Sequence, residues 1–144
     1  MIDDTSRLSQ LGSHTKYSYD APLRDILEAF PNKYPDREYS VGMEFGEFTS
    51  LCPKTGQPDF AVLRLNYSPA KLCVESKSLK LYLFAFRNYG SFMETIGNKI
   101  VEDVVAVLKP RWLDLEMEFA PRGGISLTVQ RNYTAEVEHA ADHA

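Results

Sequence analysis

The stretch SFMETIGNKIVEDVVAVLKP, residues 91–110, contains the clearest secondary-structure pattern in the chain. Its apolar residues recur every three or four positions, the spacing that places side chains on one face of an α-helix. These residues are Phe92, Ile96, Ile100, Val101, Val104, Val105 and Leu108. Ser91 followed by Glu94 fits a capping box at the start, and Pro110 marks the end. The pattern predicts an amphipathic helix with one buried face.

Segments on both sides of this helix show the composition and alternation typical of β-strands. Before it, apolar residues alternate over 41–46, and strand-forming residues fill 60–67. After it, alternation returns over 112–119 and 125–130 around a turn at 121–124, which predicts a hairpin. The order favours an α+β layer, an antiparallel sheet with helices on one side, that completes its core by assembling with copies of itself.

Two other segments carry weaker signals. Residues 22–30, PLRDILEAF, have a proline at a plausible helix start and four apolar residues on one face before Pro31, which predicts a short helix. Residues 76–88, SKSLKLYLFAFRN, form a nearly continuous apolar run that suits either a buried strand or a buried helix. The pattern alone does not decide whether this second segment is a strand or a helix.

Length and composition predict one domain. The chain has 144 residues, 44% of them hydrophobic, enough for a single core. We expect a flexible N-terminal arm at 1–20, one domain at 21–132 and a flexible C-terminal tail at 133–144, because both ends are polar and aperiodic. The net charge of −4 argues against nucleic acid as a partner. The absence of a long apolar run or a signal-peptide pattern predicts a cytoplasmic protein with no contact to a membrane.

Cys52 and Asp59 are the strongest candidates for chemistry. They lie seven residues apart on a turn-rich segment, with Asp59 at the edge of a strand. A carboxylate there could accept the proton of the thiol before it attacks, and then hand that proton to a developing nitrogen anion. The alternative is a buried loop cysteine beside an ordinary turn aspartate, the more common case on composition alone. Cys73 lies in an apolar stretch, which favours a packed small residue.

Five charged residues form a second set of candidates. Glu75 and Glu94 each begin a proposed helix, where a carboxylate can cap the helix or read the N–H donors of a guanine-like base. Lys77, Lys80 and Arg122 could form a small phosphate site, or could simply be solvated. No Cys/His spacing predicts a metal site, and no glycine-rich dinucleotide motif is present.

Four segments together resemble one known family. The segment ESKSLKLYLFAFRN, from Glu75 to Asn88, resembles the family signature very closely, and EFTSLCPKTGQPDF, from Glu47 to Phe60, resembles its catalytic loop. FPNKY near residue 30 and PRGGIS from Pro121 also match, and the four segments occur in the same order as in the family. The similarity therefore covers roughly residues 30–128. The family is QueF, the NADPH-dependent 7-cyano-7-deazaguanine reductases.

The resemblance implies a tunnelling fold (T-fold), in which antiparallel sheets from several subunits close into a barrel and active sites form between neighbours. It implies that residues 76–88 are helical, with Lys77 and Lys80 on the helical face that the family associates with NADPH. Arg122 is then expected to reach the cofactor of a neighbouring subunit. Members with one such unit per chain assemble as two facing pentameric rings, so we expect a homodecamer.

The family's chemistry gives each candidate residue a role. The loop cysteine attacks the nitrile of 7-cyano-7-deazaguanine to form a covalent thioimide, which two NADPH molecules reduce to the aminomethyl product during biosynthesis of queuosine, a tRNA modification. Cys52 stands at the position of the nucleophile and Asp59 at that of the proton donor. Four residues match those that hold the base: Val74, Glu75, Ser76 and Glu94. Covalent capture makes the nitrile a hydride acceptor and protects the imine from water.

Met93 departs from the family pattern, which usually has a histidine immediately before Glu94. Histidine can donate a hydrogen bond or relay a proton, whereas methionine can only pack against the base. We therefore expect reduced efficiency, with catalysis retained because Cys52 and Asp59 remain.

Two other functions fit part of the pattern. A non-reducing QueF-like enzyme resolves the thioimide with ammonia to an amidine, but such relatives lack the NADPH motif, which is intact here from Glu75 to Tyr82. A non-catalytic binder of deazapurines would give no reason to keep both Cys52 and Asp59.

Overall fold

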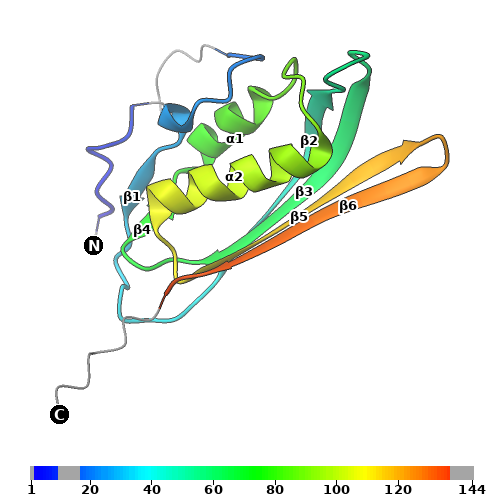
Figure 1. The fold of residues 1–144 in the computed structure, drawn as a ribbon. Helices are drawn as coiled ribbons and strands as arrows, with labels where there is room; N and C mark the ends of the chain where they lie inside the picture. The colour runs from blue at the N-terminus through cyan, green and yellow to red at the C-terminus, as the bar shows by residue number, and fades with distance from the viewer. Residues whose placement is uncertain (1, 10–16, 137–144) are drawn as a thin grey trace.

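Four long antiparallel strands form the main sheet, and two helices cover one of its faces (Figure 1). The computed structural model describes residues 2–9 and 17–136. The sheet has the order β2-β3-β5-β6, and a separate two-stranded sheet pairs β1 with β4. The elements are η1 (Arg24–Ile26, a 3₁₀ turn), β1 (Ala29–Pro31), β2 (Val41–Leu51), β3 (Pro58–Ser68), β4 (Leu72–Val74), α1 (Ser76–Phe84), α2 (Met93–Leu108), β5 (Trp112–Arg122) and β6 (Ile125–Thr134). This arrangement confirms the predicted α+β class and the predicted hairpin.

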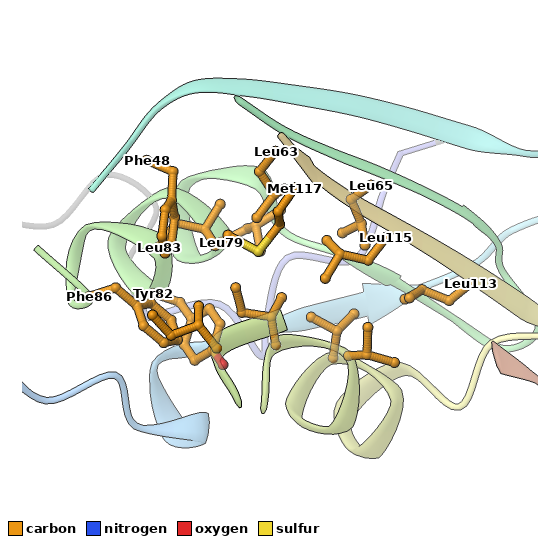
Figure 2. Packing of buried hydrophobic residues seen from close by; sticks show 14 of the residues in the cluster. Phe48, Leu63, Leu65, Leu79, Tyr82, Leu83, Phe86, Leu113, Leu115 and Met117 are labelled. Carbon is orange, nitrogen blue, oxygen red and sulfur yellow. The ribbon is translucent and has the colours of Figure 1, made fainter. Parts of the chain in front are cut away.

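The core lies between the sheet and the helices because each long strand buries alternate side chains. On β3, Leu63 and Leu65 are almost fully buried, while their neighbour Arg64 points to the other face. Figure 2 shows side chains of the sheet packed toward Tyr82 of α1 and toward Phe86, which lies in the turn after this helix. The alternation read from the sequence therefore places one face of the sheet against the helices.

Helix α2 confirms the strongest sequence prediction, but it begins differently. The N-cap residue is Phe92, whose side chain makes no capping hydrogen bond, so the predicted capping box from Ser91 is wrong. The Ser91 N–H instead donates to the Leu51 carbonyl at 3.1 Å, which ties this residue to the end of β2. A Cβ at Gly97 would lie 2.6 Å from Val129 Cγ1, so glycine lets α2 approach β6 closely.

Helix α1 shows that residues 76–84 of the ambiguous segment are helical, whereas residues 85–88 form turns. The prediction for 22–30 is also wrong in part. Only Arg24–Ile26 form a helical turn, while Ala29–Pro31 pair with Leu72–Val74. A short isolated helix is marginal, and strand pairing satisfies more of the backbone here. Strand β6 also continues to Thr134, two residues beyond the expected domain boundary at 132.

The chain ends are described only in part. Residues 1, 10–16 and 137–144, which belong to the predicted arm and tail, lie outside the described residues. In the described part of the arm, the Tyr17 ring packs edge-on against Phe84 of α1. Among the described residues, no helix is both long enough and apolar enough to cross a membrane.

A buried polar network fixes the two helices and η1 relative to one another. The Asp103 carboxylate of α2 accepts hydrogen bonds from Tyr82 Oη at 2.6 Å, Lys99 Nζ at 2.8 Å and Arg24 Nε at 2.9 Å. Because a buried carboxylate needs such partners, this network favours one relative placement of the helices. The starts of α1 and α2 thereby have defined positions.

Candidate active site

Cys52 lies on a tight turn between β2 and β3. The Cys52 N–H donates to the Gln57 carbonyl at 2.8 Å, and the Gly56 N–H donates to the Cys52 carbonyl at 3.0 Å. Gly56 has φ of +71°, a left-handed conformation that favours glycine. The turn therefore holds the thiol in one place at the end of the sheet.

The environment of the turn favours the thiolate form of Cys52. Hydrogen bonds from the Thr55 hydroxyl and the Thr55 N–H lower the pKa of the thiol to about 6. The Lys54 N–H and the Arg122 guanidinium lower this pKa further, whereas partial desolvation raises it. Cys52 occupies a position like the N-cap of a helical turn, with Pro53 next, so the following N–H groups point back at the sulfur. At neutral pH the group is mostly a nucleophilic thiolate.

Asp59 is buried at the start of β3, with its side chain only 3% exposed. Arg122 Nε lies 3.2 Å from Asp59 Oδ1, close enough for an ion pair. This contact lacks the geometry of a hydrogen bond, so Oδ1 has no hydrogen-bond donor among the described residues. Ser50, directly opposite Asp59 in the sheet, likewise has an unpartnered hydroxyl within the described structure. The carboxylate is therefore held by charge and can still accept a hydrogen bond from a ligand.

The segment before α2 brings the start of that helix to the thiol. The Leu51 N–H donates to the Tyr89 carbonyl at 3.1 Å, and Leu51 also pairs with Gly90 as an isolated bridge. A Cβ at Gly90 would lie 3.4 Å from Pro53 Cα, so the segment before α2 packs directly against the turn that carries Cys52. Met93 and Glu94, in the first turn of α2, consequently face the same space as Cys52.

These elements enclose a pocket of about 300 Å³. Its lining consists of Cys52, Pro53, Asp59, Ser91, Phe92, Met93, Glu94, Ala120, Arg122, Ile125 and Leu127. Phe92 and Ile125 are among the most exposed large apolar side chains of the described chain, at 66% and 71%. Glu94 is exposed, and no described residue pairs with its carboxylate. The pocket thus combines a thiolate, two carboxylates and an apolar rim, which suits a small heterocycle with N–H donors.

The structure divides the predicted site residues into two groups. Cys52, Asp59, Met93, Glu94 and Arg122 line the pocket. The other group contains Val74, Glu75, Ser76, Lys77 and Lys80, which lie at the end of β4 and on α1, outside the pocket lining. Figure 1 shows the start of α1 beside β1 and the β5–β6 turn at the opposite end of the sheet. One chain therefore does not bring the two groups together.

Glu75 acts as the N-cap of α1, which is the first of the two roles that its sequence position allows. Its carboxylate accepts hydrogen bonds from the Lys77 N–H at 2.7 Å and the Ser78 N–H at 2.8 Å. Lys80 lies over the Tyr17 ring, with Nζ 5.9 Å from the ring centroid. Arg122 contacts Asp59 and Gln57, so a phosphate site that joins it to these lysines does not form within one chain.

Sequence reasoning missed Thr55, Gln57 and Ser50. Thr55 makes the largest contribution to the lowered pKa of Cys52, and Gln57 accepts a hydrogen bond from Arg122 at 3.1 Å. The order Cys-Pro-Lys-Thr-Gly resembles a helix start with proline after the cap and threonine two residues later. That pattern could have revealed Thr55, whereas Gln57 and Ser50 carry no distinctive sequence signal.

The fold and the pocket define a T-fold protein with an activated thiol. A solved structure, that of the archaeosine synthase QueF-Like in the apo form, superposes with a TM-score of 0.59 at 15% identity, covering 69% of this chain and 96% of that chain. At this identity, the likeness supports the fold alone.

Sequence comparison makes the assignment more specific. The family model described as QueF-like protein matches residues 58–138. A relative from Nitratidesulfovibrio vulgaris (strain Hildenborough) is 51% identical, covering 99% of this chain and 86% of the relative. Relatives from Syntrophus aciditrophicus (53%, covering 91% and 89%) and Bacteroides thetaiotaomicron (47%, covering 99% and 96%) are also similar. All three are named NADPH-dependent 7-cyano-7-deazaguanine reductase. The chain belongs to the QueF family.

Proposed function

We propose that this chain is an NADPH-dependent 7-cyano-7-deazaguanine reductase, which converts the nitrile to 7-aminomethyl-7-deazaguanine for queuosine biosynthesis in the cytoplasm. The observation that carries the proposal is the thiol of Cys52, whose pKa is lowered to about 6, in a pocket beside the buried carboxylate of Asp59. Relatives of that name, close to half identical over nearly the whole chain, support the choice of substrate and of NADPH as reductant.

The proposed reaction begins with attack of the Cys52 thiolate on the nitrile carbon. A C–S bond forms, one π pair of the nitrile moves to nitrogen, and that nitrogen takes up a proton from solvent, passed on by Asp59, to give a thioimide. NADPH, when bound, supplies two hydrides to the former nitrile carbon, one before and one after the C–S bond breaks to release the thiolate. Two hydrides and two protons convert the nitrile to the amine, which balances the reaction.

Base recognition is assigned to the charged group at the start of α2. A ring N–H and an exocyclic amino group are donors, and the unpaired Glu94 carboxylate is an acceptor that faces the pocket. Met93 would pack its thioether against the ring in place of a hydrogen-bonding histidine. We assign the apolar rim to exclusion of water from the imine stage.

We further propose that Val74, Glu75, Ser76 and the NADPH-binding residues Lys77 and Lys80 reach the pocket from a neighbouring copy. Two observations support this arrangement: the residues lie apart within one chain, and β2 and β6 are the edge strands of the main sheet, where strands of another copy could pair. The expected assembly is a decamer of two pentameric rings. Native mass spectrometry of the full chain would measure it.

The function is tested by mixing the protein with the nitrile and NADPH. Loss of nicotinamide absorbance at two NADPH per nitrile consumed supports the reductase. A covalent mass adduct without NADPH oxidation, with amidine formed on adding ammonia, would replace it with the non-reducing enzyme. Binding with neither adduct nor oxidation would indicate a binder.

A matched pair of cysteine variants identifies the nucleophile. Cys52→Ala should abolish both the adduct and NADPH oxidation, whereas Cys73→Ala should retain both, because Cys73 is buried in β4 outside the pocket. Persistence of the adduct in Cys52→Ala would remove Cys52 from the proposed role.

A further inference from the structure

Arg122 lies in the pocket beside Asp59, apart from the lysines of α1. Its Nε atom is 3.2 Å from Asp59 Oδ1, and its Nη2 donates to Gln57 Oε1 at 3.1 Å. Cys52 lines the same pocket. Arg122 is the only cationic residue that lines this pocket among the described residues.

The pocket needs such a cation for an electrostatic reason. A thiolate and a carboxylate that share a small pocket repel one another, and without a nearby positive charge one of them takes up a proton. The Asp59 side chain is 3% exposed, so water screens it poorly, while the Arg122 side chain is 35% exposed. A guanidinium has donors on several edges and keeps its charge at any relevant pH, so it can serve both acids at once.

The turn between β5 and β6 sets the position of Arg122. The pairing of β5 with β6 is irregular between Phe119 and Arg122, and resumes where Arg122 pairs with Ile125 around Gly123 and Gly124. Both glycines have positive φ, +57° and +79°, so the turn suits glycine at each position. The turn and the hydrogen bond to Gln57 together aim the guanidinium across the sheet at Asp59.

We propose that Arg122 is a positioning residue that holds the Asp59 side chain in the pocket and offsets the negative charge near Cys52, so that Cys52 can be a thiolate in the unliganded protein. This role differs from cofactor binding, the role expected from the family resemblance. It rests on the proposed function only in that Cys52 and Asp59 are the reacting pair; the electrostatic arrangement itself does not depend on the substrate.

The test measures the thiol directly, in full-length protein without nitrile or NADPH. Iodoacetamide alkylation of Cys52, followed by mass spectrometry of its peptide between about pH 5 and pH 9, gives the midpoint of thiolate formation. Arg122→Gln should raise the midpoint by about half to one pH unit, which lowers the alkylation rate at pH 6 by about twofold to fivefold. Arg122→Lys keeps the charge but loses the planar fork, so its midpoint should lie between those of the natural protein and Arg122→Gln.

A double variant separates this role from a structural one. In Arg122→Gln/Asp59→Asn the repelling carboxylate is also gone, so the midpoint should return toward that of the natural protein. Arg64→Gln removes the same charge on the opposite face of the sheet, where Arg64 pairs with Glu44 and Glu118, and should leave the midpoint unchanged.

An unchanged midpoint in Arg122→Gln would overturn the proposal. A double variant whose midpoint stays as high as that of Arg122→Gln would overturn it as well, because the carboxylate would then not be the second partner. Thermal unfolding of each variant checks that the fold is kept. Since no substrate is used, this result stands apart from the reductase assay, and either can fail alone.

Discussion

Glu75 and Glu94 carry the same side chain and are expected to hold the same base, yet they have opposite environments. Glu75 is buried at 6% exposure, and both its carboxylate oxygens accept N–H groups at the start of α1. Glu94 is exposed at the start of α2 and has no partner among the described residues. One helix start is satisfied by its own side chain, and the other is open toward the pocket.

This difference shows that the residues that stabilise the fold and the residues available for chemistry lie in different parts of the molecule. At the start of α1, polar groups are used up by the fold, so changes there affect unfolding first. Around the pocket, Asp59 Oδ1 and the Glu94 carboxylate have no hydrogen-bond donor among the described residues. Changes there should affect chemistry while leaving the fold in place.

The largest expected effect is that of Glu94→Gln on substrate affinity. Loss of charge-assisted hydrogen bonds to the base should weaken binding of the nitrile by about tenfold to a hundredfold, from roughly 1.5–3 kcal/mol per such interaction. Titration calorimetry of the nitrile against Cys52→Ala and Cys52→Ala/Glu94→Gln proteins measures binding without reaction. A fall in the unfolding temperature of Glu94→Gln would contradict the comparison, because Glu94 would then support the fold.

Thr55→Val should change the pH profile of Cys52. Only the thiolate is alkylated, so with the pKa of Cys52 lowered to about 6 the rate should rise with pH and reach half its plateau near pH 6. Removal of the Thr55 hydroxyl, the largest cause of the lowering, should move the midpoint up by about one unit, and the rate at pH 6 should fall about fivefold. Thr55→Ser keeps the hydroxyl and is the control; equal midpoints in the two variants would remove the hydroxyl from this role.

Glu75→Ala should lower stability by about 1 kcal/mol, the usual loss for a helix cap. Urea unfolding measures this change in the free energy of unfolding, with Glu94→Ala as the matched control at the other helix start. If both variants unfold alike, the contrast between the two glutamates fails. If Glu75→Ala keeps full stability, its capping hydrogen bonds contribute nothing measurable.

Met93→His should have a modest effect on the reaction rate. One added hydrogen bond of roughly 0.5–1.5 kcal/mol should improve kcat/KM for the nitrile severalfold, about twofold to tenfold. Steady-state NADPH oxidation measures it, with Met93→Leu as an apolar control. An unchanged rate and affinity in Met93→His would show that this position does not limit the reaction.

Local patterns in the sequence predicted much of the fold. Helix α2 and the β5–β6 hairpin follow from periodicity, because each buries one face against the same core. The segment 22–30 was mispredicted because its pairing partner, Leu72–Val74, lies far along the chain. The capping box failed for a similar reason, since the backbone of Ser91 is already bonded to Leu51.

The sequence by itself determined the α+β class, the candidate pair Cys52 and Asp59 and, through family resemblance, the chemistry expected of them. Only the tertiary structure decided which candidates lie close together. Arg122 contacts Asp59, Thr55 donates hydrogen bonds to the Cys52 thiolate, and Glu75 caps α1, outside the pocket. The physical reason is that residue type and spacing specify local conformation, whereas the pKa of a thiol and the reach of an arginine depend on groups that strand pairing brings together across the sheet.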